Sequence, residues 1–373
     1  MHRTLAAGVT LAALLAPCAN ADTRFWHIQN TGYYHDGNDG TALALRNGSV
    51  WPTIFTDDGR ALAQFATGWT DLVPFNVSLF PRTYDMPLRA TSSADHRVTV
   101  TTDDQSSGSG YLSNNGVTLS RTGFTPLPDH TLAADYGPDG NLYLLLKNPD
   151  TSDRYVPGLP DPEYNDYHDI AVSPFGEVGL IDDRYGFAEY SPLRGDWQYV
   201  DFYDLPDPDN RFNNFTAISL EYDALGRPHV LGELDNQAAA LDYHPATGWT
   251  LTDFTQDLTL NGTFDKAYDL AADSLGNVGT ALYLDGFEST ANALYYLHHD
   301  GDEWSAHLVE NDTNLDIRYD AQFGIAYDHE DLPVISYVTN GTIHLAYDPI
   351  IVPEPAALTL LSLTALTLAR RTR

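Results

Sequence analysis

Short segments of alternating apolar and polar residues recur along the chain, and a turn that contains Asp or Gly interrupts each of them. Five segments share one pattern, in which an apolar strand, a turn and a second apolar strand follow one another. An Asp- or Gly-containing turn between two such strands is typical of a β-hairpin, because these residues tolerate the backbone of tight turns. The predicted hairpins cover 132–144, 169–180, 217–230, 269–278 and 323–335, with turn residues Gly140, Gly176, Gly226, Gly276 and Asp331.

The hairpins form a repeat, because their turn residues are separated by 36, 50, 50 and 55 residues. A tryptophan begins an alternating strand in several units, at Trp69, Trp197, Trp249 and Trp304. An earlier hairpin is predicted around Gly59, and a degenerate unit around 98–119. Units of roughly 50 residues with three or four strands are typical of β-propeller blades. The sequence therefore predicts an all-β fold, a seven-bladed β-propeller, with six blades as the alternative.

Ring closure makes a separate prediction about the two ends of the repeat region. The final unit has three predicted strands and ends at 342–347. Residues 24–29 match the tryptophan-marked outer strand that this unit lacks. We therefore expect the N-terminal strand to close the last blade. A β-sandwich offers no reason for a repeat of this length, and a β-helix needs shorter rungs.

The repeats resemble those of secreted bacterial BNR-like or sialidase-like propellers. A sialidase Asp-box has the pattern Ser-x-Asp-x-Gly-x-x-Trp, and none of the turns has it. The nearest approach, residues 56–59, lacks the following tryptophan. The resemblance therefore implies an architecture and no catalytic residues.

The N-terminal segment, residues 1–21, has the features of a secretory signal peptide. Arg3 provides the positive charge, residues 5–15 the apolar stretch, and Ala19 and Ala21 the small-residue cleavage site. The only cysteine, Cys18, lies inside this segment. The mature chain is therefore expected to have neither a disulfide nor thiol chemistry.

The C-terminal segment, residues 351–373, combines three features in a fixed order. Pro353, Glu354 and Pro355 are followed by an apolar run over 356–369 and then by basic residues that include Arg370 and Arg371. This order resembles the PEP-CTERM sorting signal of Gram-negative bacteria, which is also catalogued as an ice-binding-protein C-terminal domain. The resemblance implies a short transmembrane sorting helix and a membrane-bound exosortase as partner, with transient contact with the inner membrane. It implies display at the cell surface or release after processing.

Between these segments, residues 22–350 form the predicted propeller domain. The 52 acidic residues against 19 Lys and Arg give a formal net charge of −33, which argues against a nucleic-acid partner. The acidic residues are 42 Asp and only 10 Glu. With so many Asp, some pair will stand at a glycosidase-like separation by chance, so carboxylate pairs alone indicate little.

Sequence motifs for common chemistries are absent, including Gly-x-Ser-x-Gly, phosphate-binding glycine loops and compact zinc-ligand spacings. His298 and His299 are adjacent, so on a strand their rings face opposite sides and do not share one metal.

Candidate ligand residues lie at the start of the innermost strands, which line the central channel of a propeller. These residues are Asp129, Tyr167, Asp169, Tyr268, Asp269 and Asp320. Converging carboxylates are candidates to hold Ca²⁺, and tyrosines beside carboxylates suit a sugar. The alternative is that these Asp residues cap backbone amides of loops.

These observations favour a secreted propeller at the cell surface or in the extracellular matrix, a non-enzymatic module that binds polysaccharide, a surface protein or Ca²⁺. The alternative is a glycoside hydrolase or lyase that uses carboxylates at the channel mouth.

Overall fold

The computed structural model describes most of the predicted repeat region. The described residues are 26–34, 41–45, 52–56, 61–65, 68–71, 88–92, 97–102, 108–114, 119–126, 128, 131–148, 154–162, 167–182, 186–206, 211–235, 237–258, 260, 263–265, 269–285, 292–312, 315, 317, 323–328 and 330–347. The predicted signal peptide and sorting signal lie outside these residues. Within the described residues, no helix is long and apolar enough to cross a membrane.

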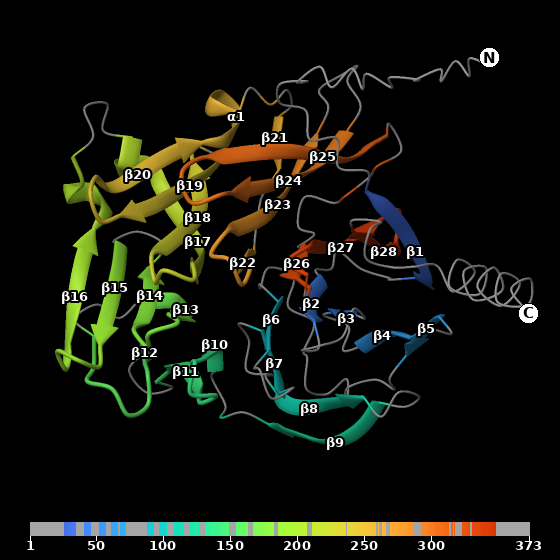
Figure 1. The fold of residues 1–373 in the computed structure, drawn as a ribbon, viewed down its shortest axis with the longest axis horizontal. Coiled ribbons are helices and arrows are strands. Elements are labelled where there is room, and N and C mark those ends of the chain that lie inside the picture. Colours follow the sequence, from blue (N-terminus) through green and yellow to red (C-terminus); the bar gives the residue numbers. More distant parts are fainter. Residues whose placement is uncertain are drawn as a thin grey trace, which may run out of the picture.

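The described strands form seven antiparallel sheets (Figure 1). The first two hold β2 (Thr41–Leu45), β3 (Pro52–Thr56), β4 (Ala61–Phe65) and β5 (Gly68–Asp71), then β6 (Leu88–Ser92), β7 (Arg97–Thr102), β8 (Gly108–Asn114) and β9 (Leu119–Pro126). The third holds β10 (Thr131–Tyr136), β11 (Leu142–Lys147) and β12 (Arg154–Tyr155), and the fourth β13 (Tyr167–Val172), β14 (Val178–Asp182), β15 (Gly186–Ser191) and β16 (Asp196–Asp201).

The remaining three sheets complete the set. The fifth holds β17 (Phe215–Tyr222), β18 (Pro228–Leu234), β19 (Gln237–His244) and β20 (Gly248–Asp253). The sixth holds β21 (Thr263–Asp265), β22 (Leu270–Ala272), β23 (Val278–Asp285), β24 (Asn292–His299) and β25 (Trp304–Asp312). The last holds β26 (Gly324–Tyr327), β27 (Pro333–Thr339), β28 (Thr342–Tyr347) and β1 (His27–Tyr34). Among the described residues, three single-turn helices lie between strands: η2 (Phe202–Asp204), η3 (Arg211–Asn214) and α1 (Phe254–Asp257).

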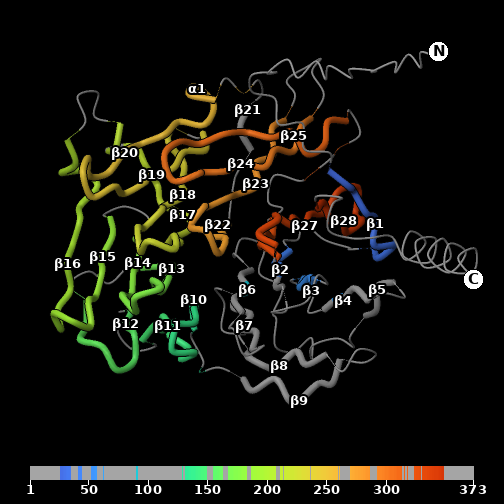
Figure 2. The backbone as a smooth tube through the Cα atoms, in the orientation of Figure 1, coloured from blue at the N-terminus to red at the C-terminus, as the bar shows by residue number. Residues whose placement is uncertain are grey.

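The sheets are arranged in a ring. The innermost strands contact one another in the order β2, β6, β10, β13, β17, β22 and β26, and β26 contacts β2 again. Figure 2 shows the chain passing around this ring from the N-terminal to the C-terminal strands. The five sheets from β10 onwards are described with most of their side chains, whereas the first two are described largely as backbone. The predicted all-β propeller architecture is confirmed.

Each of the five predicted inner hairpins has its predicted turn residue in the left-handed region. Gly140, Gly176, Gly226 and Gly276 have φ between 72° and 95°, and Asp331 has φ 61°. In the fifth sheet, Oδ1 of Asp223 accepts hydrogen bonds from the N–H groups of Leu225 and Arg227, at 2.9 and 2.8 Å. Asp273 and Asp328 accept the same two backbone hydrogen bonds in their own turns, so the motif is repeated in the sixth and last sheets. An Asp side chain thus replaces the backbone partner that a tight turn lacks.

The recurrent tryptophans join neighbouring sheets. The ring nitrogen of Trp197, in the fourth sheet, donates to the carbonyl of Pro160 at 2.9 Å; Pro160 lies in the segment that precedes the fourth sheet. Trp249 packs edge-on against Phe187 of the fourth sheet and Phe202 of η2, with ring centroids 5.4 and 5.8 Å apart. Trp249 therefore packs against the sheet before its own and Trp197 bonds to the segment before its own sheet, which explains the recurrence of tryptophan at this place.

The N-terminal strand closes the last sheet, as predicted. β1 pairs antiparallel with β28, with His27 opposite Tyr347. The strand begins later and runs further than the predicted 24–29, and residues 24 and 25 lie outside the described part. Trp26 lies 5.5 Å from the ring of Tyr296 in the sixth sheet, so it takes the place of the recurrent tryptophan in this sheet.

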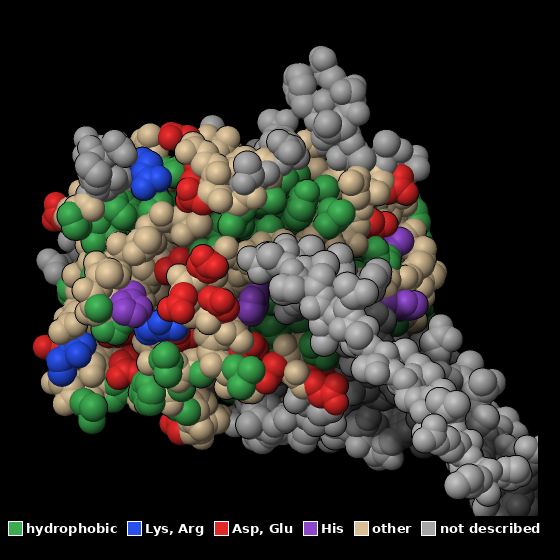
Figure 3. Space-filling model, turned by 45° about the horizontal axis from the view of Figure 1, so that its top comes forward, with side chains coloured by type: hydrophobic (Ala, Val, Ile, Leu, Met, Phe, Trp, Pro, Cys, Tyr) green, Lys and Arg blue, Asp and Glu red, His purple; other side chains and the backbone are tan. Residues whose placement is uncertain are grey.

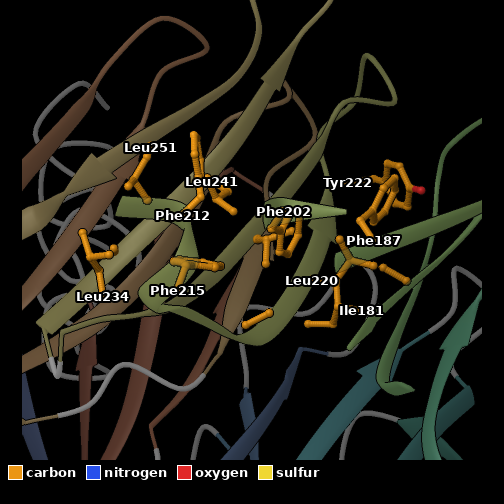
Figure 4. Close-up of a cluster of buried hydrophobic side chains, with 14 residues drawn as sticks. Ile181, Phe187, Phe202, Phe212, Phe215, Leu220, Tyr222, Leu234, Leu241 and Leu251 are labelled. Carbon is orange, nitrogen blue, oxygen red and sulfur yellow. The ribbon is translucent and has the colours of Figure 1, made fainter. Parts of the chain in front are cut away.

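Hydrophobic clusters fill the spaces between neighbouring sheets. Figure 4 shows the cluster between the fourth and fifth sheets, where Phe202, Phe212 and Phe215 are at most 6% exposed. Phe202 and Phe215 meet edge to face at 5.9 Å. Burial of each such aromatic side chain contributes on the order of 2–3 kcal/mol, so these clusters hold neighbouring sheets together.

Candidate functional site

A central cavity of about 320 Å³ lies inside the ring, lined by residues of all seven innermost strands. Most lining side chains are small or apolar, such as Ala134, Ala171 and Ala271. Four acidic side chains also line it: Asp135, Asp169, Glu221 and Asp269.

The four acids alternate between two positions along the repeat. Asp135 and Glu221 stand five residues before the turn residue of their hairpin (140 − 135 and 226 − 221). Asp169 and Asp269 stand seven residues before it (176 − 169 and 276 − 269). Positions two residues apart lie on the same face of a strand, so both kinds of position face the channel, at two heights.

Three of these carboxylates bind the backbone of the next sheet. Oδ2 of Asp135 accepts from Val172 N–H at 2.8 Å. Oδ2 of Asp169 accepts from Leu220 N–H at 2.9 Å. Oδ2 of Asp269 stands 3.5 Å from Ile325 N–H, a long contact of the same kind. The acids therefore link successive sheets around the ring.

Asp169 uses both of its oxygens in this way, because Oδ1 also accepts from Ile170 N–H at 2.9 Å. The side chain is buried, with 4% exposure. Glu221 differs, since its described hydrogen bond is to the N–H of the next residue, Tyr222, at 3.0 Å. Burial, and then the negative charge of Asp135, raise the pKa of Glu221 well above its usual value.

The structure brings two of the predicted ligand residues together. Asp169 and Asp269 both line the channel, at equivalent positions. Tyr167, expected at the channel mouth, is instead 1% exposed and packs in a hydrophobic cluster. Asp129, Tyr268 and Asp320 lie outside the described residues. Within the described part, no group of three or more His, Cys, Asp or Glu side chains is arranged to hold a metal ion.

A second cavity, which we call the inter-sheet pocket, lies between the outer parts of the fifth and sixth sheets and measures about 520 Å³. Its lining comes from β18, β19, β20, their adjoining turns and α1 on one side and from β24, β25 and their connecting turn on the other (Figure 1). It includes Arg227, His229, Asp242, Thr252, His299 and Trp304.

Buried polar side chains form the floor of this pocket. His229, which is 1% exposed, holds Oδ1 of Asp242 with its Nδ1 at 2.7 Å. The other oxygen of Asp242 accepts from the Trp304 ring nitrogen at 2.7 Å, which ties the two sheets together. The His299 ring lies between the rings of His229 and Trp304, at 5.1 and 5.2 Å.

The pKa values of His229 and His299 shift in opposite directions. Burial disfavours the charged form of His229, but the carboxylates of Asp223 and Asp242 outweigh it and raise the pKa of His229. Burial likewise opposes ionisation of Asp223, yet His229 and Arg227 lower the pKa of Asp223 to about 2. Burial lowers the pKa of His299. The floor thus favours an imidazolium between two carboxylates, beside a neutral imidazole.

Sequence reasoning missed this pocket, because His229, Asp242 and Trp304 come from three strands in two repeats. The adjacent His298 and His299 do face opposite sides, since His299 is 6% exposed and His298 only partly buried. The recurrence of tryptophan marked Trp304, although as a repeat residue and not as part of a pocket.

No family model and no curated protein sequence matches the chain. Solved structures do. A catalytically inactive virginiamycin B lyase from Staphylococcus aureus with quinupristin has a TM-score of 0.54 and 11% identity, over 87% of this chain and 99% of that one. The chain is a β-propeller. YCF48 bound to D1 peptide has a TM-score of 0.50 and 12% identity, over 88% of this propeller and 96% of that chain. At such identities the likeness shows the fold and not the activity.

Proposed function

We propose that this propeller is a secreted, exosortase-sorted protein of the cell surface or extracellular matrix, and that it is a binding module rather than an enzyme. The sequence features of residues 1–21 and 351–373 support secretion and sorting. The observation that carries the non-enzymatic assignment is the engagement of Asp169 by two backbone N–H groups. With one backbone N–H bound to each oxygen, Asp169 has the role of a structural carboxylate that links two sheets.

We further propose that all seven sheets act as blades, including the two that are described largely as backbone. The closed order of innermost strands supports this count. Candidate ligands are an extracellular polysaccharide, a surface protein or Ca²⁺. The inter-sheet pocket supports ligand binding, because its volume of about 520 Å³ lies within the range of small-molecule sites, roughly 300–1,000 Å³.

Sorting is tested by expressing the full chain in a Gram-negative bacterium with and without its exosortase. We expect surface or released protein only where the exosortase is present, and retention in the inner membrane for the variant Pro353→Ala, Glu354→Ala, Pro355→Ala. Unchanged export of that variant would overturn the sorting proposal.

Binding is tested separately, with the purified protein and extracellular polymer from the same bacterium. Sedimentation of the protein with intact polymer, without a change in polymer length, is the expected result. Shortened polymer chains or unsaturated sugar products would instead support the alternative, a glycoside hydrolase or lyase.

A further inference from the structure

We propose that the inter-sheet pocket binds a saccharide that carries amino groups. This inference rests on the proposed binding function and names its site and ligand class. Two features of the pocket carry it: hydroxyl groups that suit a polyhydroxylated ligand, and carboxylates that have no basic partner.

The hydroxyl groups come from one strand and its turn. Thr250 and Thr252 lie two residues apart on β20 and both line the pocket, as does Thr247 in the preceding turn. Thr247 and Thr250 are exposed, and Thr252 is half-buried. A threonine hydroxyl both donates and accepts hydrogen bonds, which matches the hydroxyl groups of a sugar.

The basic groups of the pocket are already occupied. Nε of Arg227 lies 2.5 Å from Oδ2 of Asp223, and its Nη1 donates to the carbonyl of Gly301 at 3.3 Å. His229 lies between Asp223 and Asp242. Neither cation is therefore free to hold a carboxylate or sulfate of an acidic polysaccharide.

The acidic groups at the rim have no basic partner, although Oδ2 of Asp257 accepts from Asp253 N–H at 2.9 Å. Asp302 and Glu303 are exposed, and Asp257 lines the opposite side. Among the described residues, no salt bridge joins any of these three to a basic side chain. On the face shown in Figure 3, acidic side chains gather near the centre, beside few basic ones. The acidic side chains at the rim and the net charge of −33 together attract an ammonium group and repel an acidic saccharide.

The floor of the pocket supplies an independent observation. Nε2 of His229 is buried and stands 3.6 Å from Oδ2 of Asp223, an ion-pair distance that is too long for a hydrogen bond. A buried ring nitrogen that makes an ion pair but no hydrogen bond can still bond to water or to a ligand hydroxyl.

The test is calorimetric titration of the purified full-length chain with three ligands: a hexasaccharide of glucosamine, the neutral hexasaccharide cellohexaose and a hexasaccharide of galacturonate. We expect the glucosamine hexasaccharide to bind most tightly and the galacturonate hexasaccharide not to bind. The pocket variant is Asp302→Asn with Glu303→Gln. The matched control is Asp161→Asn with Asp285→Asn, which removes the same charge from exposed residues outside the pocket.

We expect the pocket variant to lose about tenfold in affinity and the control to lose less than about twofold. Equal affinity for the neutral and amino saccharides, or tighter binding of the acidic one, would overturn the ligand class. Saccharide binding that the pocket variant leaves unchanged would overturn the site. If no saccharide binds while the protein still sediments with extracellular polymer, this inference fails and the binding function stands.

Discussion

The buried charges around Asp223 make a prediction that one pair of variants can test. Asp223 and Asp273 begin equivalent turns in the fifth and sixth sheets, and each accepts two backbone N–H bonds and one side-chain bond. The side-chain donor is the Arg227 guanidinium in one turn and the neutral Asn277 amide in the other. Asp223 also faces His229. The two turns therefore differ mainly in charge.

The magnitude follows from the pKa of Asp223. A fall from 3.8 to about 2 corresponds to about 2 kcal/mol of preference for the charged form in the folded state. Loss of the turn hydrogen bonds costs each variant about 2 kcal/mol. We therefore expect Asp273→Ala to lose about 2 kcal/mol of unfolding free energy and Asp223→Ala about 4 kcal/mol, since it also removes the carboxylate that pairs with Arg227 and faces His229.

The difference between the variants should depend on pH. The folded-state pKa of Asp223 is lowered, so its stabilisation is present above about pH 4 and is lost as pH falls toward 2. The folded-state pKa of His229 is raised, so its stabilisation is complete below its unfolded pKa of about 6.5 and is lost as pH rises through the raised value. The difference should be largest between about pH 4 and 6.5.

The assay is urea unfolding followed by tryptophan fluorescence at pH 3, 5 and 8. Equal losses for Asp223→Ala and Asp273→Ala at pH 5 would refute the assignment of charge to this network. A difference that stays constant across all three pH values would refute it too, because no titrating group would then contribute.

Four further predictions follow from the packing and charge of the ring. Gly186→Ala should cost at least about 3 kcal/mol in thermal melting, because φ is 142° and a Cβ would stand 1.9 Å from the Val200 carbonyl oxygen; Gly32→Ala, which has φ 78° but no atom within 4 Å, is the control that has backbone strain without the clash. Trp26→Ala should lose about 3 kcal/mol in urea unfolding, since its ring packs on the sixth sheet, and an unchanged midpoint would contradict ring closure by β1. Asp169→Asn should lower the melting temperature equally in EDTA and in millimolar Ca²⁺; a Ca²⁺-dependent rise lost in this variant would support a calcium site instead. The melting temperature of the unaltered protein should rise with NaCl, because salt screens a net charge of −33, and independence of salt would contradict self-repulsion.

The repeat itself could be predicted because its signals are local. A turn that needs a left-handed residue selects Gly or Asp within a few positions, and Gly276 and Asp331 both fill that requirement. An outer strand that packs on its neighbour selects tryptophan at a fixed place, as at Trp249. Ring closure followed from the same logic, since Trp26 marks the strand that completes the last sheet.

The inter-sheet pocket could not be predicted, because it depends on contacts between repeats. Asp242 is one of 42 Asp residues, and only the packing of the fifth sheet against the sixth places it beside Trp304. Nothing near Asp242 in the sequence distinguishes it from an Asp that begins a turn, such as Asp273.

The error at Tyr167 has a physical cause that also explains the channel. Strict alternation places Tyr167 and Asp169 on the same face, toward the channel. The register shifts between them, however, since Tyr167 pairs with Asp182 and Asp169 with Ile181. Such a bulge turns the residues on its two sides to different faces, so Tyr167 enters the core while Asp169 stays in the channel.

The same register shift occurs between Thr131 and Ala133 and between Ala217 and Ser219. In each pair the first residue stands nine positions before the turn residue of its hairpin (140 − 131 and 226 − 217), and the second stands seven positions before it (140 − 133 and 226 − 219). The bulge is therefore part of the repeat and not a local accident. Downstream of it, alternation holds and places acids five or seven residues before the turn in the channel. For residues before the bulge, such as Tyr167, counting by twos no longer tells which side chains face the channel. Residues at the start of the strand are therefore poor candidates for a channel site unless the bulge is taken into account.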